Sequence, residues 1–141
     1  MHCHSGPMLN ATSAGANAIF GIPVGTRFFS AFVSEFQLGG GTPRTFEFKA
    51  ADGTVSTITS TDPGRALITG QIADANAFKI PTIWNARQTA PYFHNNGAKN
   101  LDELLNHYQQ YFNFVQTVVG IPGFGMTDQD KADIRAYLEL L

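Results

Sequence analysis

The sequence predicts a mostly α-helical domain with one small β-hairpin and long irregular loops. Two capped helical patterns lie in the last third of the chain, one pair of alternating segments surrounds a turn, and glycine and proline occur 14 and 7 times. The chain has 141 residues, of which 43% are hydrophobic, so it has the size of one domain with a sizeable core. We therefore expect residues 1–141 to form a single domain.

The first helical pattern follows Asn100, a residue type that caps helix N-termini well. Asp102 and Glu103 lie in its first turn, where acidic side chains are favourable. His107 lies about 100° round the helix from Tyr108. Because Tyr108 shares the apolar face, we expect it to point inward in preference to His107; that face comprises Leu101, Leu105, Tyr108 and Phe112.

The second helical pattern follows Thr127, another good capping residue, with Asp128 and Asp130 in its first turn. Its expected core face comprises Ile134, Tyr137, Leu138 and Leu141. The glycine-rich stretch 120–125 between the two patterns predicts a loop.

The rest of the chain predicts one hairpin among loops. Residues 45–49 alternate, residues 54–58 are rich in β-branched side chains, and Asp52-Gly53 between them predicts the turn. Before the hairpin we expect a short helix after Cys3, then mostly loop with a helical turn around residues 30–36. Pro81 and Pro91 predict an extended, irregular segment over residues 78–94.

Composition excludes several classes of function. A net charge of −2 argues against a nucleic-acid binder, and no apolar run approaches the ~20 residues of a membrane span. Zinc, nucleotide and serine-hydrolase motifs are missing, and we expect no signal peptide. Charged residues make up only 14%, and there are 12 phenylalanines, so apolar surface must be hidden in a core, against a flat cofactor or against a partner domain.

The single cysteine, Cys3, directly precedes His4 near the N-terminus. In haem c attachment the pattern is Cys-x-x-Cys-His, and residues 1–4 match its last four positions. Taken alone, the pair is equally compatible with a small buried thiol and a solvated histidine.

Three later motifs are more specific, and they follow one another in order: Asp62-Pro63-Gly64-Arg65, Phe78-Lys79-Ile80-Pro81-Thr82-Ile83-Trp84-Asn85, and Thr89-Ala90-Pro91-Tyr92-Phe93-His94-Asn95-Asn96-Gly97. With Cys3-His4-Ser5-Gly6-Pro7 and the capped final helix, they resemble the C-terminal haem domain of the bacterial dihaem cytochrome c peroxidase family, which includes the MauG group. The resemblance covers residues 1–141. It implies a cytochrome c-type haem domain from a periplasmic oxidoreductase, in a fragment that begins inside the attachment motif.

The resemblance implies one covalently attached haem c, with Cys3 forming a thioether and His4 as the proximal iron ligand. Counted from His94, the position on the opposite side of the iron is Tyr108, where the peroxidases carry Met and the MauG group Tyr. Tyr108 as a plain core aromatic stays the alternative, and Met8 and Met126 are weaker candidates for the ligand.

Other family positions imply contacts around the cofactor. Arg65 matches a residue that would pair with a haem propionate, although a solvated turn arginine fits as well. Trp84 stands where the family has Arg and would offer an aromatic relay for electrons. His94 would bond backbone or a propionate. Backbone carbonyls of Thr89 and Pro91 match positions that help hold an interdomain calcium in the full-length peroxidases.

The expected function is electron transfer between a redox partner protein and a second haem, in the missing N-terminal haem domain, that reacts with peroxide. Alone, the chain is not expected to be a competent peroxidase. Two alternatives stay open: a free-standing monohaem electron carrier, and a haemless interaction module.

Overall fold

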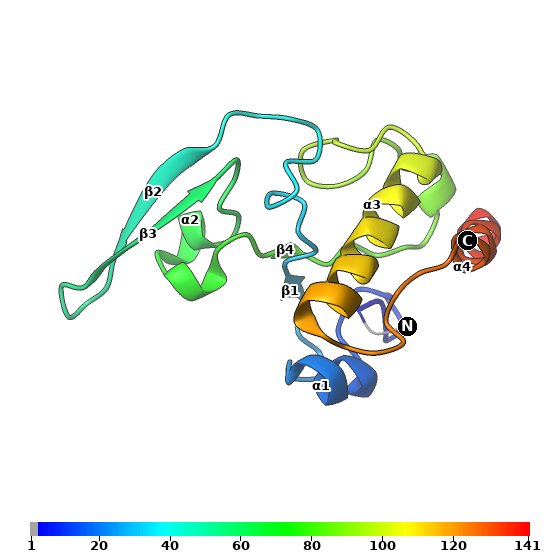
Figure 1. Ribbon diagram of the computed structural model, residues 1–141, viewed down its shortest axis with the longest axis horizontal. Helices are drawn as coiled ribbons and strands as arrows, with labels where there is room; N and C mark the ends of the chain where they lie inside the picture. Colours follow the sequence, from blue (N-terminus) through cyan, green and yellow to red (C-terminus); the bar gives the residue numbers. More distant parts are fainter. Residues whose placement is uncertain (1–2) are drawn as a thin grey trace. The chain divides into compact units, whose positions relative to one another are not determined.

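The computed structural model describes residues 3–141, so Met1 and His2 of the attachment-like stretch lie outside the described residues. The chain divides into two compact units, one ending at Ile83 and the other comprising Trp84–Leu141 (Figure 1). In the described residues, four α-helices are accompanied by two small antiparallel sheets, so the fold is a small mixed α/β arrangement in which helices are the longest elements. The expectation of a single domain stays a prediction.

In the first unit, a turn and not a helix follows Cys3. Ser5 and Ala11 pair as an antiparallel bridge, with the Ser5 amide 2.9 Å from the Ala11 carbonyl oxygen. Gly6 has a positive φ of 74°, outside the right-handed helical region, and the Leu9 amide donates to the Gly6 carbonyl at 3.0 Å, so residues 6–9 form a turn. The expected helix begins later, as α1 (Ala14–Phe20), after Ser13, whose side chain accepts a bond from the amide of Ala16.

The predicted hairpin is confirmed as β2 (Arg44–Lys49) and β3 (Val55–Ser60), paired from Arg44 opposite Ser60 to Lys49 opposite Val55. Asp52 Oδ1 accepts a bond from the Thr54 amide at 2.9 Å, and Gly53 has φ 86°, as the Asp-Gly turn requires. The hairpin projects from its unit in Figure 1.

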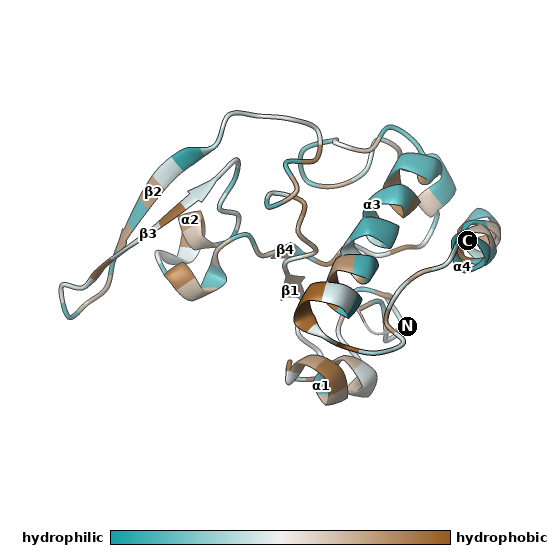
Figure 2. Cartoon of the chain, in the orientation of Figure 1, coloured by the Kyte–Doolittle hydropathy of each residue, from teal (hydrophilic) through white to brown (hydrophobic). Residues whose placement is uncertain are grey.

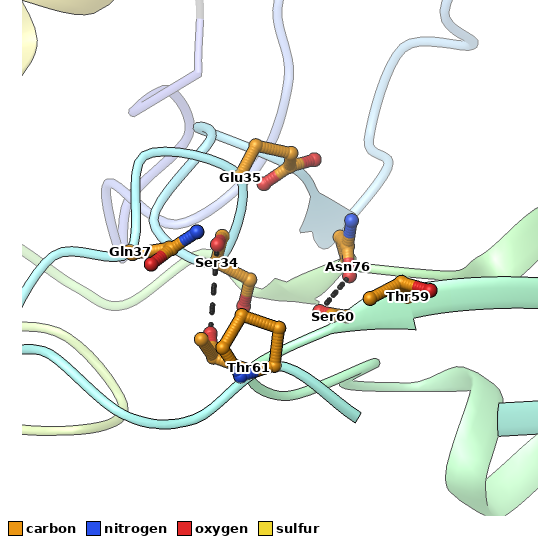
Figure 3. Close-up of a pocket in the computed structure, with 8 residues that line it drawn as sticks. Ser34, Glu35, Gln37, Thr59, Ser60, Thr61 and Asn76 are labelled. Carbon is orange, nitrogen blue, oxygen red and sulfur yellow. Dashed lines mark hydrogen bonds between the residues drawn. The ribbon is translucent and has the colours of Figure 1, made fainter. Parts of the chain in front are cut away.

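Buried polar contacts anchor the base of this hairpin (Figure 3). Ser60 Oγ donates to Asn76 Oδ1 at 2.8 Å, and Ser34 Oγ donates to the Asp62 carbonyl at 2.8 Å. Ser34, Ser60 and Asn76 are all buried. The three side chains also line a small polar cavity, and their bonds fix where the chain leaves β3.

The same unit joins the Gly-Arg turn to the Phe-Lys-x-Pro-Thr motif. Gly64 and Ala77 form a parallel bridge, and a Cβ added at Gly64 would lie 2.6 Å from the Ala77 carbonyl oxygen, so only glycine fits. After the short helix α2 (Ala66–Thr69) and a 3₁₀ turn (Ile72–Asp74), β4 (Phe78–Lys79) pairs with β1 (Phe28–Phe29).

The second unit consists of a 3₁₀ turn (Ala86–Gln88), α3 (Leu101–Phe114), a π-helical turn (Val115–Val119) and α4 (Asp128–Leu140). Both predicted caps are confirmed. Asn100 accepts a bond from the Glu103 amide at 2.9 Å, and Thr127 and Asp130 form a reciprocal capping box. No helix of residues 3–141 is long and apolar enough to cross a membrane.

The expected core face of α4 is wrong in part. Leu138 is buried, but the exposed fractions of Ile134 and Tyr137 are 36% and 39%. The reason is that polar side chains supply many of the contacts between α4 and α3: Arg135 pairs with Asp102, Lys131 Nζ donates to Asn106 at 3.0 Å, and Gln109 Nε2 donates to Asp128 at 2.9 Å.

Replacing Asn100 by Ala removes the cap of α3 and leaves the Glu103 amide without its acceptor. We expect the free energy of unfolding, measured by urea denaturation, to fall by about 1 kcal/mol. Asn100→Asp keeps an oxygen acceptor at this position and is the matched control, expected to stay near wild type. An Ala variant as stable as the Asp variant would show that the cap contributes nothing.

Candidate functional site

His4 is held by its own loop. Its ring nitrogen Nδ1 lies 2.9 Å from the carbonyl oxygen of Leu9, within the turn that the Ser5 and Ala11 pairing closes. Because a carbonyl only accepts, Nδ1 must carry the hydrogen of this bond. In the neutral ring the lone pair then lies on Nε2, which is the form of histidine that binds metals.

Burial favours this neutral form. His4 is half-buried, and burial lowers the pKa of its ring below the ordinary value, although the backbone carbonyls of Leu9 and Pro81 act in the opposite direction. Pro81 belongs to the Phe-Lys-x-Pro-Thr motif, so the fold brings that motif to the imidazole of His4. The two motifs, read from the sequence alone, do not predict this contact.

Cys3 is a free, half-buried thiol beside this histidine. Burial raises the pKa of the thiol above its ordinary value, so it stays protonated at neutral pH. A protonated thiol and a neutral imidazole in adjacent positions fit a site that attaches a porphyrin through sulfur and ligates its iron through nitrogen.

The second unit carries an aromatic cluster on α3, here called the Tyr108 cluster. Figure 2 shows that α3 itself becomes more hydrophobic toward its C-terminal end. Tyr108 stacks on Phe112 with ring centroids 5.9 Å apart and an interplanar angle of 27°, and Phe112 meets Phe124 edge-on at 5.1 Å. The members of the cluster are Phe93, His107, Tyr108, Phe112 and Phe124.

The expectation that Tyr108 would be more buried than His107 is wrong. His107 is 3% exposed, whereas Tyr108 is half-buried. The buried stripe continues along His107, Tyr111 and Val115, which are spaced i, i+4 and i+8, so it is centred further round the helix than predicted. The apolar residues Tyr111 and Val115 were the available signal for this row. Tyr108 thus lies along the stripe with part of its ring accessible.

The loop before α3 presents Phe93 to this cluster. Tyr92 and Ala98 pair as an antiparallel bridge, and the Tyr92 hydroxyl donates to the Ala86 carbonyl at 2.8 Å. Phe93 itself has a positive φ of 69°, which is uncommon for a bulky residue and is maintained here by the closed loop. Phe93 is therefore the residue by which the Thr-Ala-Pro-Tyr-Phe-His motif contacts the Tyr108 cluster.

The remaining predicted site residues are more dispersed. Arg65 pairs with Asp74 at 3.4 Å, and its guanidinium lies 4.6 Å from the Phe28 ring centroid. Trp84 is 49% exposed, and His94 is exposed. Their roles toward a cofactor stay predictions. Of the weaker ligand candidates, Met8 is exposed and Met126 is buried.

No group of three or more His, Cys, Asp or Glu side chains is gathered as a metal site in residues 3–141. The structure places His4 in the first unit and Tyr108 in the second.

Two known proteins that are similar to parts of the chain are both cytochrome c peroxidases. The chain is 50% identical over 42 residues to the cytochrome c551 peroxidase of Nitrosomonas europaea, which is 30% of this chain and 13% of that protein. It is 31% identical over 81 residues to a cytochrome c peroxidase of Denitromonas iodatirespirans, which is 57% of this chain and 21% of that protein. The chain thus spans a small part of these relatives. No protein-family model and no solved structure matches it.

The neutral state of His4 predicts a pH dependence. We expect the ring of His4, followed by nuclear magnetic resonance in the haem-free chain, to titrate with a midpoint below 6.5. The unfolded chain takes up the proton first, so stability should fall as the pH decreases from about 6.5 toward the folded pKa. His4→Gln should lack this part of the pH dependence. A midpoint at or above 6.5 would contradict the assignment.

Proposed function

We propose that this chain binds one haem c and serves as the C-terminal electron-transfer domain of a periplasmic dihaem cytochrome c peroxidase or MauG-like oxidoreductase. The observation that carries the proposal is His4, whose Nδ1 is bonded to the Leu9 carbonyl while Cys3 precedes it directly. The two cytochrome c peroxidases that are similar to the chain support the same class of cofactor.

The residues present fit this cofactor. Cys3 would hold it through a thioether, and His4 Nε2 would ligate the iron from the proximal side. Tyr108, whose side chain is half-buried, would be the second protein ligand of the iron. When bound, the haem supplies one-electron redox chemistry.

His4 and Tyr108 would each influence which oxidation state of the iron is favoured. The bond from Nδ1 to Leu9 fixes the tautomer and orientation of the His4 ring. Tyr108 would contribute an anionic oxygen, a hard donor that stabilises the ferric and higher oxidation states, where a methionine thioether would favour the ferrous state. This choice of ligand suits a centre that stores oxidising equivalents.

Surrounding residues would complete the environment. We assign Arg65 and His94 to the propionates and Trp84 to electron relay, in place of the arginine that the family carries there. In a full-length protein, carbonyls of Thr89 and Pro91 would contribute to an interdomain calcium, and we expect that site to be empty in this chain. The partners are an N-terminal haem domain and a redox partner protein, and the chain alone is not a competent peroxidase because peroxide reacts at the other haem.

The proposal predicts covalent haem in protein matured in a haem c-competent periplasm. A pyridine haemochrome spectrum should show haem that resists acid–acetone extraction. Cys3→Ala should make the haem extractable, and His4→Ala should lower the amount of haem that the chain retains. A spectrum without covalent haem in the wild type would refute the proposal.

The ligand assignment needs its own variant. In the haem-loaded chain, Tyr108→Phe should change the axial-ligand signature of the ferric state in absorption and electron paramagnetic resonance spectra, because the phenolate is lost. Tyr111→Phe is the matched control, a buried tyrosine one position from the cluster whose ring contacts Phe112, and it should leave the signature unchanged. An unchanged spectrum in Tyr108→Phe would remove Tyr108 as a ligand.

A further inference from the structure

We propose that His107 is a positioning residue, whose buried imidazole holds the ring of Tyr108 in one orientation together with Phe93. The inference rests on the proposed function, because the orientation matters for ligation only if Tyr108 is a ligand. It adds a role that the sequence motifs do not assign to His107.

Three rings form a closed triangle of contacts. His107 meets Phe93 edge-on with centroids 4.8 Å apart and an interplanar angle of 66°. His107 meets Tyr108 at 5.7 Å and 75°, and Phe93 meets Tyr108 at 5.9 Å and 46°. All three separations lie in the range of favourable aromatic pairs, which is about 4.5–7 Å. Each ring of the triangle is therefore in contact with both others.

A further ring bounds Tyr108 along the helix. Phe112, one turn later on α3, stacks on Tyr108 with an interplanar angle of 27°. The tyrosine ring is thus in contact with Phe112 from the following turn, Phe93 from the loop and His107 from the neighbouring position. Phe93 is itself constrained by its positive φ and by the Tyr92 and Ala98 bridge. The rings around Tyr108 are therefore carried by well-defined backbone: α3 for His107 and Phe112, and the closed loop for Phe93.

The choice of histidine is informative because burial of an imidazole costs free energy that an aliphatic residue avoids. Its row on α3 otherwise continues with the buried residues Tyr111 and Val115. His107 belongs to no group of three or more metal-ligating side chains within residues 3–141. The two edge-on contacts of His107, with Phe93 and Tyr108, need a planar ring at this position. A branched aliphatic side chain has no ring edge to make them.

The inference is tested first in the haem-free chain, by nuclear magnetic resonance of ¹³C-labelled tyrosine. The ring signals of Tyr108 should carry ring-current shifts from its neighbours. His107→Leu should change the shift, because one of the three neighbouring rings is lost, and should accelerate the ring flips, whereas His107→Phe should keep both near wild type. Tyr111→Leu is the matched control, because Tyr111 is 4% exposed and contacts Phe112, so its loss destabilises α3 without removing one of the rings around Tyr108.

Unchanged Tyr108 signals in His107→Leu would overturn the inference. Should that variant not fold, His107→Phe and His107→Asn carry the test: recovery by Asn but not by Phe would show that hydrogen bonding, and not the ring, sets the orientation.

The second arm uses the haem-loaded chain. His107→Leu should broaden or shift the axial-ligand signature of the ferric state, and His107→Phe should restore it. If Tyr108→Phe leaves the signature unchanged, the ligand assignment in the proposed function is wrong, and with it the role of His107 in ligation. If Tyr108→Phe changes the signature and His107→Leu does not, only the positioning role is wrong.

Discussion

The hydrogen bond between His4 Nδ1 and the Leu9 carbonyl is the constraint on which the rest of the site depends. A histidine near a chain terminus is ordinarily a mobile, solvated side chain. Here the turn closed by Ser5 and Ala11 holds the ring through the bond from Nδ1 to the Leu9 carbonyl, which assigns the ring hydrogen to Nδ1. The cost of partly burying the imidazole appears as its lowered pKa, and that same shift keeps the ring in the neutral form that binds metals.

The rest of the first unit supports this arrangement. Gly64 permits the Gly-Arg turn to approach Ala77, and the segment that follows carries Pro81 to the histidine. The N-terminal loop and the Phe-Lys-x-Pro-Thr motif, which are far apart in the sequence, therefore both contact the imidazole of His4. The hairpin, by contrast, is anchored at its base by Ser60 and Asn76 and contributes a polar junction away from this loop.

Local signals in the sequence predicted local structure well. The caps at Asn100 and Thr127 and the turn at Asp52-Gly53 depend on contacts between near neighbours, and all three are confirmed. Burial on α3 and α4 depends on what packs against each helix, which periodicity does not show. His107 is buried because the stripe follows Tyr111 and Val115, and Tyr137 is exposed because polar pairs supply many of the contacts between α4 and α3. The start of α1 was missed because Gly6 and Pro7 form a turn first.

The proposed function depends on one histidine, His4, as a ligand to the iron of a single haem. Electron–nuclear double resonance tests this on the ferric, haem-loaded chain labelled with ¹⁵N in histidine only, because the label separates imidazole nitrogen from porphyrin nitrogen. We expect coupling from one histidine nitrogen that is lost in His4→Gly, on whatever haem the variant retains, and kept in His107→Phe. Coupling that survives in His4→Gly, or coupling from two histidines in the wild type, would contradict it.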